Sequence, residues 1–191
     1  MIAALIASAL IATNAAPAEL IGRCRAMIPR EVRLAGRVIL RNRRGIELAE
    51  HRYELERSGA GGAAATRLWI DGEELKPEPG ERIKGTDVTW SDLTLDYLWW
   101  RGVEAEEDCE SVHGQTCKVL RLTEGDRTVR VWVDRSTGVL MQAEELKDGR
   151  SVRRLWGSRI KKFGDRWMAN VMEVETTGSG HRTKITVEEL K

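Results

Sequence analysis

The chain has 191 residues, of which 41% are hydrophobic and 32% are charged. This length suits one domain, and the apolar fraction supports a core and excludes a disordered protein. With 31 basic and 30 acidic residues the net charge is +1, which argues against a nucleic-acid-binding protein, because phosphate neutralisation needs a basic excess. A basic run at residues 37–44 is followed at once by acidic residues, so we interpret it as a solvated strand face.

The first 18 residues, MIAALIASALIATNAAPA, carry no charge and are rich in Ala, Ile and Leu. They predict an export signal peptide, with Ala16 and Ala18 forming an A-x-A site if cleavage falls before Glu19. No Lys or Arg precedes the run. A membrane anchor is the alternative, although polar and proline residues interrupt the roughly twenty apolar residues that an anchor needs. We therefore expect a periplasmic protein in which residues 19–191 form one domain.

One short amphipathic helix is predicted directly after this leader. Its apolar residues recur at helical spacing, and Pro29 stops the helix. The residues on this face are Leu20, Ile21, Cys24, Met27 and Ile28. We expect this face, including the thiol of Cys24, to be buried.

Beyond the helix, the hydrophobic pattern changes to the alternation of strands. Residues 32–41 and 46–57 alternate apolar and charged side chains around an Asn-Arg-Arg-Gly turn, which predicts a pair of strands. A Gly- and Ala-rich connection at residues 58–65 leads to a further strand at residues 66–74. Residues 76–87 contain two prolines and two glycines and show no periodicity, so we predict a loop there.

The next segment, VTWSDLTLDYLWW at residues 88–100, holds four of the ten aromatic residues of the chain. An acidic loop is predicted after it, at residues 102–110. A meander of six strands then follows, at residues 117–124, 127–135, 138–146, 151–160, 166–175 and 182–190. About nine antiparallel strands with a few short helical pieces and no βαβ signal predict a mainly β (α+β) fold built on a large, curved antiparallel sheet.

The concave face of such a sheet must be filled by other apolar groups. One short helix and the aromatic stretch are a modest filling for nine strands. Two interpretations of the stretch are therefore open: it is a lid over a hydrophobic cavity, or it is the missing half of a permanent core. Composition alone favours the permanent core.

The cysteines Cys109 and Cys117 flank His113 in the segment CESVHGQTC. In an oxidising compartment they can close a disulfide loop around the turn at His113. Unpaired structural thiols are an alternative. A metal site with His113 as third ligand is another, but this spacing matches none of the usual zinc patterns. We expect no metal and no other cofactor.

No enzymatic activity is expected. None of the three histidines lies beside a Ser or Cys in a recognisable nucleophile motif. Asp87 and Asp92 are interpreted as turn and cap residues in preference to a catalytic carboxylate pair.

Four segments carry motifs in a fixed order. GTDVTWSDL fits G-[ST]-D-[FVW]-[ST]-[YW]-[ES]-D-L, GQTCKVLRL fits G-x-x-C-x-x-L-x-L, and VRVWVDRSTGVLMQAEELKDG carries a Trp-Val-Asp hairpin motif. The C-terminal segment fits a W-x-P-x-x-[MV] strand with Ala169 in place of the proline, then a Thr-Gly turn and a last strand. Together they resemble the outer-membrane lipoprotein-sorting proteins, the LolA-like family. The resemblance covers residues 80–191 well and residues 19–75 in outline. The matching residues are Gly85, Thr86, Asp87, Trp90, Asp92, Leu93, Gly114, Cys117, Leu120, Leu122, Trp132, Val133, Asp134, Thr137 and Glu145.

The resemblance implies an unclosed half β-barrel whose short helices plug a hydrophobic cavity, and it reverses the preference for a permanent core. It implies a periplasmic carrier that shelters the acyl chains of lipoproteins or lipids on the way to the outer membrane. An inner-membrane donor transporter and an outer-membrane acceptor are the implied partners. A sensor or scaffold that binds lipid or a partner without transport is the alternative. The strand arginine that holds the lid in the family's best-studied carriers cannot be assigned among Arg33, Arg37, Arg41 and Arg52.

Strand parity and the aromatic stretch together give a predicted set of ligand-binding residues for the cavity and its lid. We expect a monomer with this set facing the ligand. The set is Val38, Leu40, Tyr53, Leu55, Leu68, Ile70, Trp90, Leu93, Leu95, Leu98, Trp99, Trp100, Val131, Met141 and Met168.

Overall fold

A computed structural model describes residues 16–191 of the chain, apart from residues 60, 79 and 164–165. Most of the predicted signal peptide, residues 1–15, therefore lies outside the described residues. Within the described ranges, no helix combines the length and the apolar character needed to cross a membrane.

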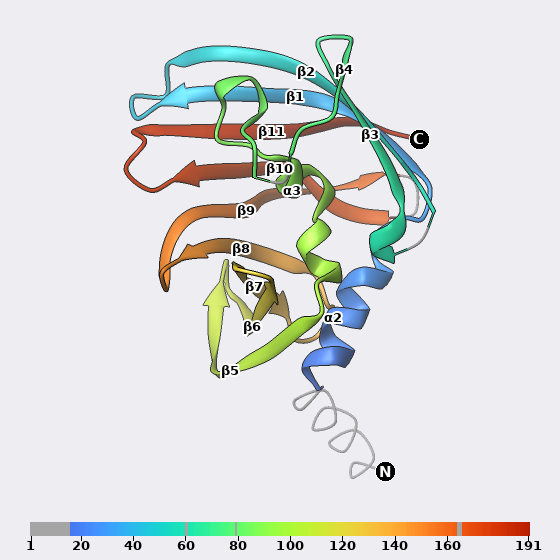
Figure 1. The fold of residues 1–191 in the computed structure, drawn as a ribbon, viewed down its shortest axis with the longest axis vertical. Helices are drawn as coiled ribbons and strands as arrows, with labels where there is room; N and C mark the ends of the chain where they lie inside the picture. The colour runs from blue at the N-terminus through green and yellow to red at the C-terminus, as the bar shows by residue number, and fades with distance from the viewer. Residues whose placement is uncertain (1–15, 60, 79, 164–165) are drawn as a thin grey trace.

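Eleven strands form one antiparallel sheet in the order β4-β3-β2-β1-β11-β10-β9-β8-β7-β6-β5. Strands adjacent in the chain pair with each other, apart from β4 and β5, and β1 pairs with β11, which joins the two ends of the chain. β4 and β5 are left as free edges, so the sheet curls into an unclosed barrel (Figure 1). The strands are β1 (Val32–Asn42), β2 (Glu47–Ser58), β3 (Ala65–Ile70), β4 (Glu73–Leu75), β5 (Gly102–Val112), β6 (Gln115–Glu124), β7 (Arg127–Asp134), β8 (Leu140–Lys147), β9 (Arg150–Phe163), β10 (Arg166–Thr176) and β11 (His181–Leu190).

The predicted acidic loop at residues 102–110 is wrong, because this segment is the edge strand β5. Its acidic side chains find cationic partners across the sheet: Glu106 lies 3.1 Å from Arg121 and 2.6 Å from Arg130. Charged residues are common on edge strands, since they discourage pairing with other chains. The charges hid the strand pattern in the sequence.

Helical segments lie on the concave side of the sheet (Figure 1). α2 (Pro17–Ala26) buries Leu20, Ile21 and Cys24, as predicted from their spacing. Burial raises the pKa of the Cys24 thiol to about 11, so this thiol stays protonated at neutral pH. The other pieces are η2 (Gly61–Ala63), η3 (Ile83–Gly85), α3 (Trp90–Thr94) and η4 (Asp96–Trp99).

The main core fills the concave side, and a smaller cluster of Val112, Cys117, Val119 and Trp132 lies apart from it. Val131 belongs to the main core and its neighbour Trp132 to the small cluster, because successive strand residues point to opposite faces. The indole N–H of Trp132 donates to Glu110 at 2.9 Å, and Arg130 stacks on its ring at 4.7 Å. The outward tryptophan is thus covered by β5 and by an arginine.

All three cysteines are free in the described chain. Cys109 is exposed and lies opposite Lys118, whereas Cys117 is buried and lies opposite Glu110. The register thus places the two thiols on opposite faces of the β5–β6 pair, and the disulfide considered from the sequence is not formed. Among the described residues, no three His, Cys, Asp or Glu side chains gather where they could hold a metal ion.

At the β1–β11 pair, the backbone of β11 packs directly against Gly36 of β1. A Cβ atom at this position would lie 1.8 Å from the carbonyl oxygen of Thr186 on β11. Real Cβ atoms do not approach a backbone oxygen so closely, so any larger residue must push the two strands apart.

We expect Gly36→Ala to lower the free energy of unfolding by about 2 kcal/mol or more, since overpacking typically costs 1–3 kcal/mol, and the urea midpoint falls with it. Gly22→Ala is the matched control, because a Cβ at this position in α2 meets nothing within 4 Å. It should leave stability unchanged or raise it. Equal midpoints for the two variants would contradict the tight junction.

Candidate functional site

A cavity of about 230 Å³ lies between the concave face of the sheet and the helical segments. On one side it is bounded by the end of α2 and by the α3–η4 segment. On the other side it is bounded by β1 and β2 and by β8 to β11. The wall is mainly apolar, which suits a hydrophobic ligand.

The predicted ligand-binding residues fall into three groups, and their role in binding stays a prediction. The cavity wall contains Tyr53, Leu55, Leu93, Leu95, Leu98, Met141 and Met168. The packed core beside it contains Val38, Leu68, Ile70, Trp100 and Val131, and Trp90 and Trp99 pack against that core. Leu40 is half-buried opposite Thr183, away from the cavity wall.

Several wall residues were missed by sequence reasoning. Leu155 comes from β9, and Ile28 and Pro29 follow α2. Arg57 is the least expected of them. The alternation of strand side chains could have identified it, because Arg57 lies two residues beyond Leu55 and therefore on the same face of β2.

The aromatic stretch forms a kinked plug, which we define as residues 86–100. Its two helical turns, α3 and η4, meet at Leu95, whose φ of 54° and ψ of 34° are left-handed. Such a conformation is rare for leucine and persists only when packing enforces it. The kink allows Leu93, Leu95 and Leu98 all to reach the cavity wall.

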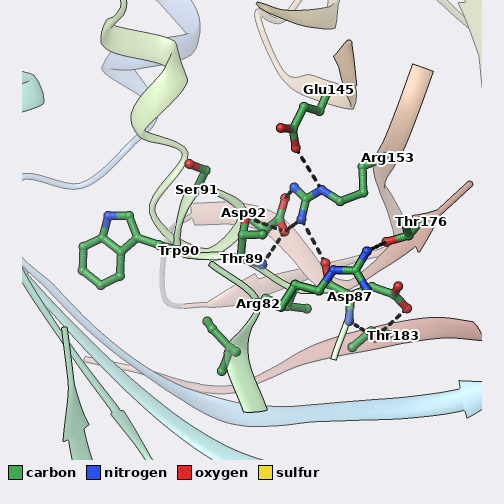
Figure 2. Close-up of polar contacts among 12 residues, drawn as sticks. Arg82, Asp87, Thr89, Trp90, Ser91, Asp92, Glu145, Arg153, Thr176 and Thr183 are labelled. Carbon is green, nitrogen blue, oxygen red and sulfur yellow. Dashed lines mark hydrogen bonds and ion pairs between the residues drawn. The ribbon is translucent and has the colours of Figure 1, made fainter. Parts of the chain in front are cut away.

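Arg153 of β9 fixes the start of the plug (Figure 2). Its guanidinium binds both carboxylate oxygens of Asp92 at 2.8 Å and the carbonyl oxygen of Asp87 at 2.9 Å. Glu145 on β8 accepts a further hydrogen bond from its Nε at 3.1 Å. The side chains of Arg153 and Asp92 are only 11% and 3% exposed, so this is a buried, bidentate ion pair.

Asp92 also caps the N-terminus of α3. Its carboxylate accepts from the backbone N–H of Thr89 at 2.8 Å and from the Thr89 hydroxyl at 3.1 Å, in a capping box at the start of α3. Burial raises the pKa of Asp92, and the Arg153 guanidinium opposes that shift. The predicted cap role of Asp92 is therefore combined with a long-range ion pair that the sequence did not reveal.

Further polar contacts hold the rest of the plug. Arg25 of α2 donates to the carbonyl oxygen of Leu98 at 2.6 Å. Arg127 of β7 lies 4.7 Å from the ring centroid of Trp100 and donates to Ser91 at 3.1 Å. The Thr183 hydroxyl on β11 donates to Asp87 at 3.1 Å.

The arginines considered from the sequence do not contact the plug. Arg33, Arg37 and Arg41 form ion pairs with glutamates on the solvent-facing side of the sheet, and Arg52 is exposed. Instead, the side chains of Arg25, Arg127 and Arg153 donate hydrogen bonds to the plug, and Arg57 stacks on its Trp99.

Comparisons with known proteins agree with this architecture. No curated protein matches the chain. A sequence-family model, described as an uncharacterized-protein family, matches residues 75–191, which is more than half of the chain. A LolA superfamily protein from Nitrosomonas europaea superposes with a TM-score of 0.72 at 16% identity, covering 93% of this chain and 94% of that one. The chain belongs to the family that this sequence-family model describes, and its fold is LolA-like.

Two further structures share the fold. A DUF1329 family protein from Desulfovibrio piger gives a TM-score of 0.70 at 16% identity, covering 90% of each chain. An outer membrane lipoprotein-sorting protein domain from Vibrio parahaemolyticus gives 0.69 at 15% identity, covering 91% of this chain and 90% of that one. At such identities the likeness shows the fold of this LolA-like protein.

The motifs that carried the resemblance have structural roles here. Asp87 and Asp92 anchor the plug. Asp134 orders the β7–β8 turn, because its Oδ1 accepts hydrogen bonds from the backbone N–H groups and the hydroxyls of Ser136 and Thr137. These contacts favour the ionised form and hold the pKa of Asp134 below its usual value, against the opposing effect of its burial. The LolA-like motifs therefore mark the plug anchor and a turn of the sheet.

We expect Asp92→Asn to destabilise the protein by about 3 kcal/mol, because breaking a buried pair leaves the other charge uncompensated. Urea unfolding would measure the loss. Arg33→Ala, which removes an exposed pair with Glu54, is the control and should change little. In a double-mutant cycle, Asp92→Asn combined with Arg153→Met should cost clearly less than the sum of the single changes. Strict additivity would show that the pair does not hold the plug.

Proposed function

We propose that this LolA-like protein is exported to the periplasm, with residues 1–18 as its signal peptide, and binds an acyl chain of a lipid or lipoprotein there. It then carries the chain towards the outer membrane. The observation that carries this proposal is the apolar cavity beneath a plug that polar contacts hold in place. An inner-membrane donor and an outer-membrane acceptor are proposed as its partners. The likeness to a lipoprotein-sorting domain supports this reading.

The energetics of a carrier require two states of similar free energy. Each buried methylene contributes about 0.8 kcal/mol, so a sixteen-carbon chain gains roughly 12 kcal/mol gross. The bilayer offers the same gain, and the carrier must also release the chain. A closed state in which the plug fills its own cavity provides the competing state, and Leu93, Leu95 and Leu98 supply the filling.

The cavity volume of about 230 Å³ is smaller than an ordinary ligand pocket of roughly 300–1,000 Å³. It admits part of an acyl chain, and a whole chain must displace the leucines of the plug. The start of the plug is fixed to the sheet by Arg153. We therefore place the movement after Asp92, at residues 93–99, with the left-handed Leu95 as its hinge; this movement breaks the hydrogen bond from Arg25 to the Leu98 carbonyl oxygen.

Methionines support an adaptable wall. Met27, Met141, Met168 and Met172 all line the cavity, and Met27 is 44% exposed at its edge. Thioether side chains are flexible and polarisable, so they repack around irregular guests at low cost. A permanent, ligand-free core has no need of four such residues around one void.

The test is lipid mass spectrometry on organic extracts of the protein, expressed with its leader and purified from the periplasm without detergent. We expect near-stoichiometric acyl lipid in the wild type. Met172→Trp should abolish most of this lipid load, because the larger side chain fills the cavity. The control Leu48→Trp adds the same side chain at a site that is 50% exposed, and it should retain the lipid load. A clean extract from stable wild-type protein would overturn the proposal, and equal loads in both variants would place the ligand elsewhere.

A further inference from the structure

Arg57 on β2 is a buried cation in the wall of an otherwise apolar cavity. It is 8% exposed, and its neighbours across the sheet, Val32 on β1 and Thr66 on β3, line the cavity with it. A guanidinium carries five N–H donors and no acceptor. Burying such a group is costly unless its charge and its donors are satisfied.

The structure satisfies Arg57 only in part. Its Nη2 donates to the carbonyl oxygen of Gly61 at 2.7 Å, and its guanidinium carbon lies 4.6 Å from the ring centroid of Trp99. Its Nε is buried and has no hydrogen-bond partner. Among the described residues no carboxylate forms an ion pair with it, and burial lowers its pKa.

The contrast with Arg153 shows what is missing. Both arginines are buried on the concave side of the sheet. Arg153 has two carboxylates and a backbone carbonyl as partners, whereas Arg57 has one carbonyl and an aromatic face. Neutral acyl chains offer no acceptor for the remaining donors.

We propose that Arg57, with the hydroxyl of Thr66 beside it, binds the anionic head of the ligand, a carboxylate or a phosphate, while the acyl chain occupies the apolar cavity. This inference rests on the proposed function and specifies its ligand class as an anionic amphiphile. The planar fork of arginine matches either oxyanion in a bidentate manner. Trp99 keeps the guanidinium in place, because Arg57 stacks on its ring.

The experiment compares probes that share one chain and differ in the head group. Delipidated full-length protein, purified from the periplasm, is titrated with hexadecanoate, hexadecyl phosphate and hexadecanol by displacement of a neutral fluorescent acyl probe at pH 8. We expect at least one anionic probe to bind on the order of tenfold or more tighter than hexadecanol, as hydrogen bonds to charged groups allow. A preference for phosphate indicates a phospholipid-type ligand, and a preference for carboxylate indicates a fatty acid.

Variants then locate the effect. Arg57→Gln should remove the anionic preference, measured as the ratio of the affinities for the anionic probe and for hexadecanol. Arg57→Lys should retain part of this preference, because the charge stays and the fork is lost. Arg52→Gln is the matched control: it lies on the same strand, makes the same change in charge and is exposed. It should keep the full preference.

Equal binding of all three probes to the wild type would overturn the role of Arg57 and leave the carrier proposal standing. An anionic preference that persists in Arg57→Gln would also overturn the role of Arg57 and leave the carrier proposal standing. Failure of every probe, including hexadecanol, would overturn the proposed function itself. The head-group comparison on the wild type does not depend on the folding of any variant.

Discussion

The buried ion pair between Arg153 and Asp92 decides where the plug lies on the sheet. Hydrophobic burial is non-directional, so an aromatic and leucine-rich segment alone would not select one position on a broad concave face. A bidentate pair does select one, because both carboxylate oxygens must meet the guanidinium at 2.8 Å. Its desolvation cost is met by the capping box and by Glu145, which occupy the remaining donors and acceptors. The strand β9 and the plug thus form one unit.

Polar and apolar contacts divide the plug between them. The part up to Asp92 is held by directed bonds that an acyl chain cannot replace. The part from Leu93 to Trp99 contributes mainly apolar surface to the cavity wall and its surroundings, apart from the hydrogen bond that Arg25 donates to the Leu98 carbonyl, and a methylene chain offers the same apolar contact. Under the proposed function, ligand binding exchanges leucine side chains for ligand carbons at nearly constant apolar burial. The left-handed Leu95 lies within this second part, and packing against its neighbours enforces its strained conformation.

The sequence predicted those features that depend on local pattern. Alternation and Gly- or Asp-bearing turns located the strands of the meander, and helical spacing located α2. The edge strand β5 was missed because its charges mask alternation and because its pairing with Arg121 and Arg130 is long-range. The cap role of Asp92 was predicted from its neighbours, but its partner Arg153 is 61 residues away and no local pattern links them. Arg57 could have been recognised from the face it shares with Tyr53 and Leu55.

An unsatisfied arginine in such a cavity changes selectivity more than it changes affinity. Apolar burial is nearly equal in the cavity and in a bilayer, so a neutral chain has little preference between them. In the empty protein Arg57 is desolvated and only partly compensated by Gly61 and Trp99, which raises the free energy of the empty state. An anionic head removes that penalty and gains a charge-assisted bond, whereas a neutral head leaves the penalty in place. Under the proposed role of Arg57, the cavity discriminates through the ligand that completes its polar contacts, and the acyl chain supplies the binding energy common to all candidates.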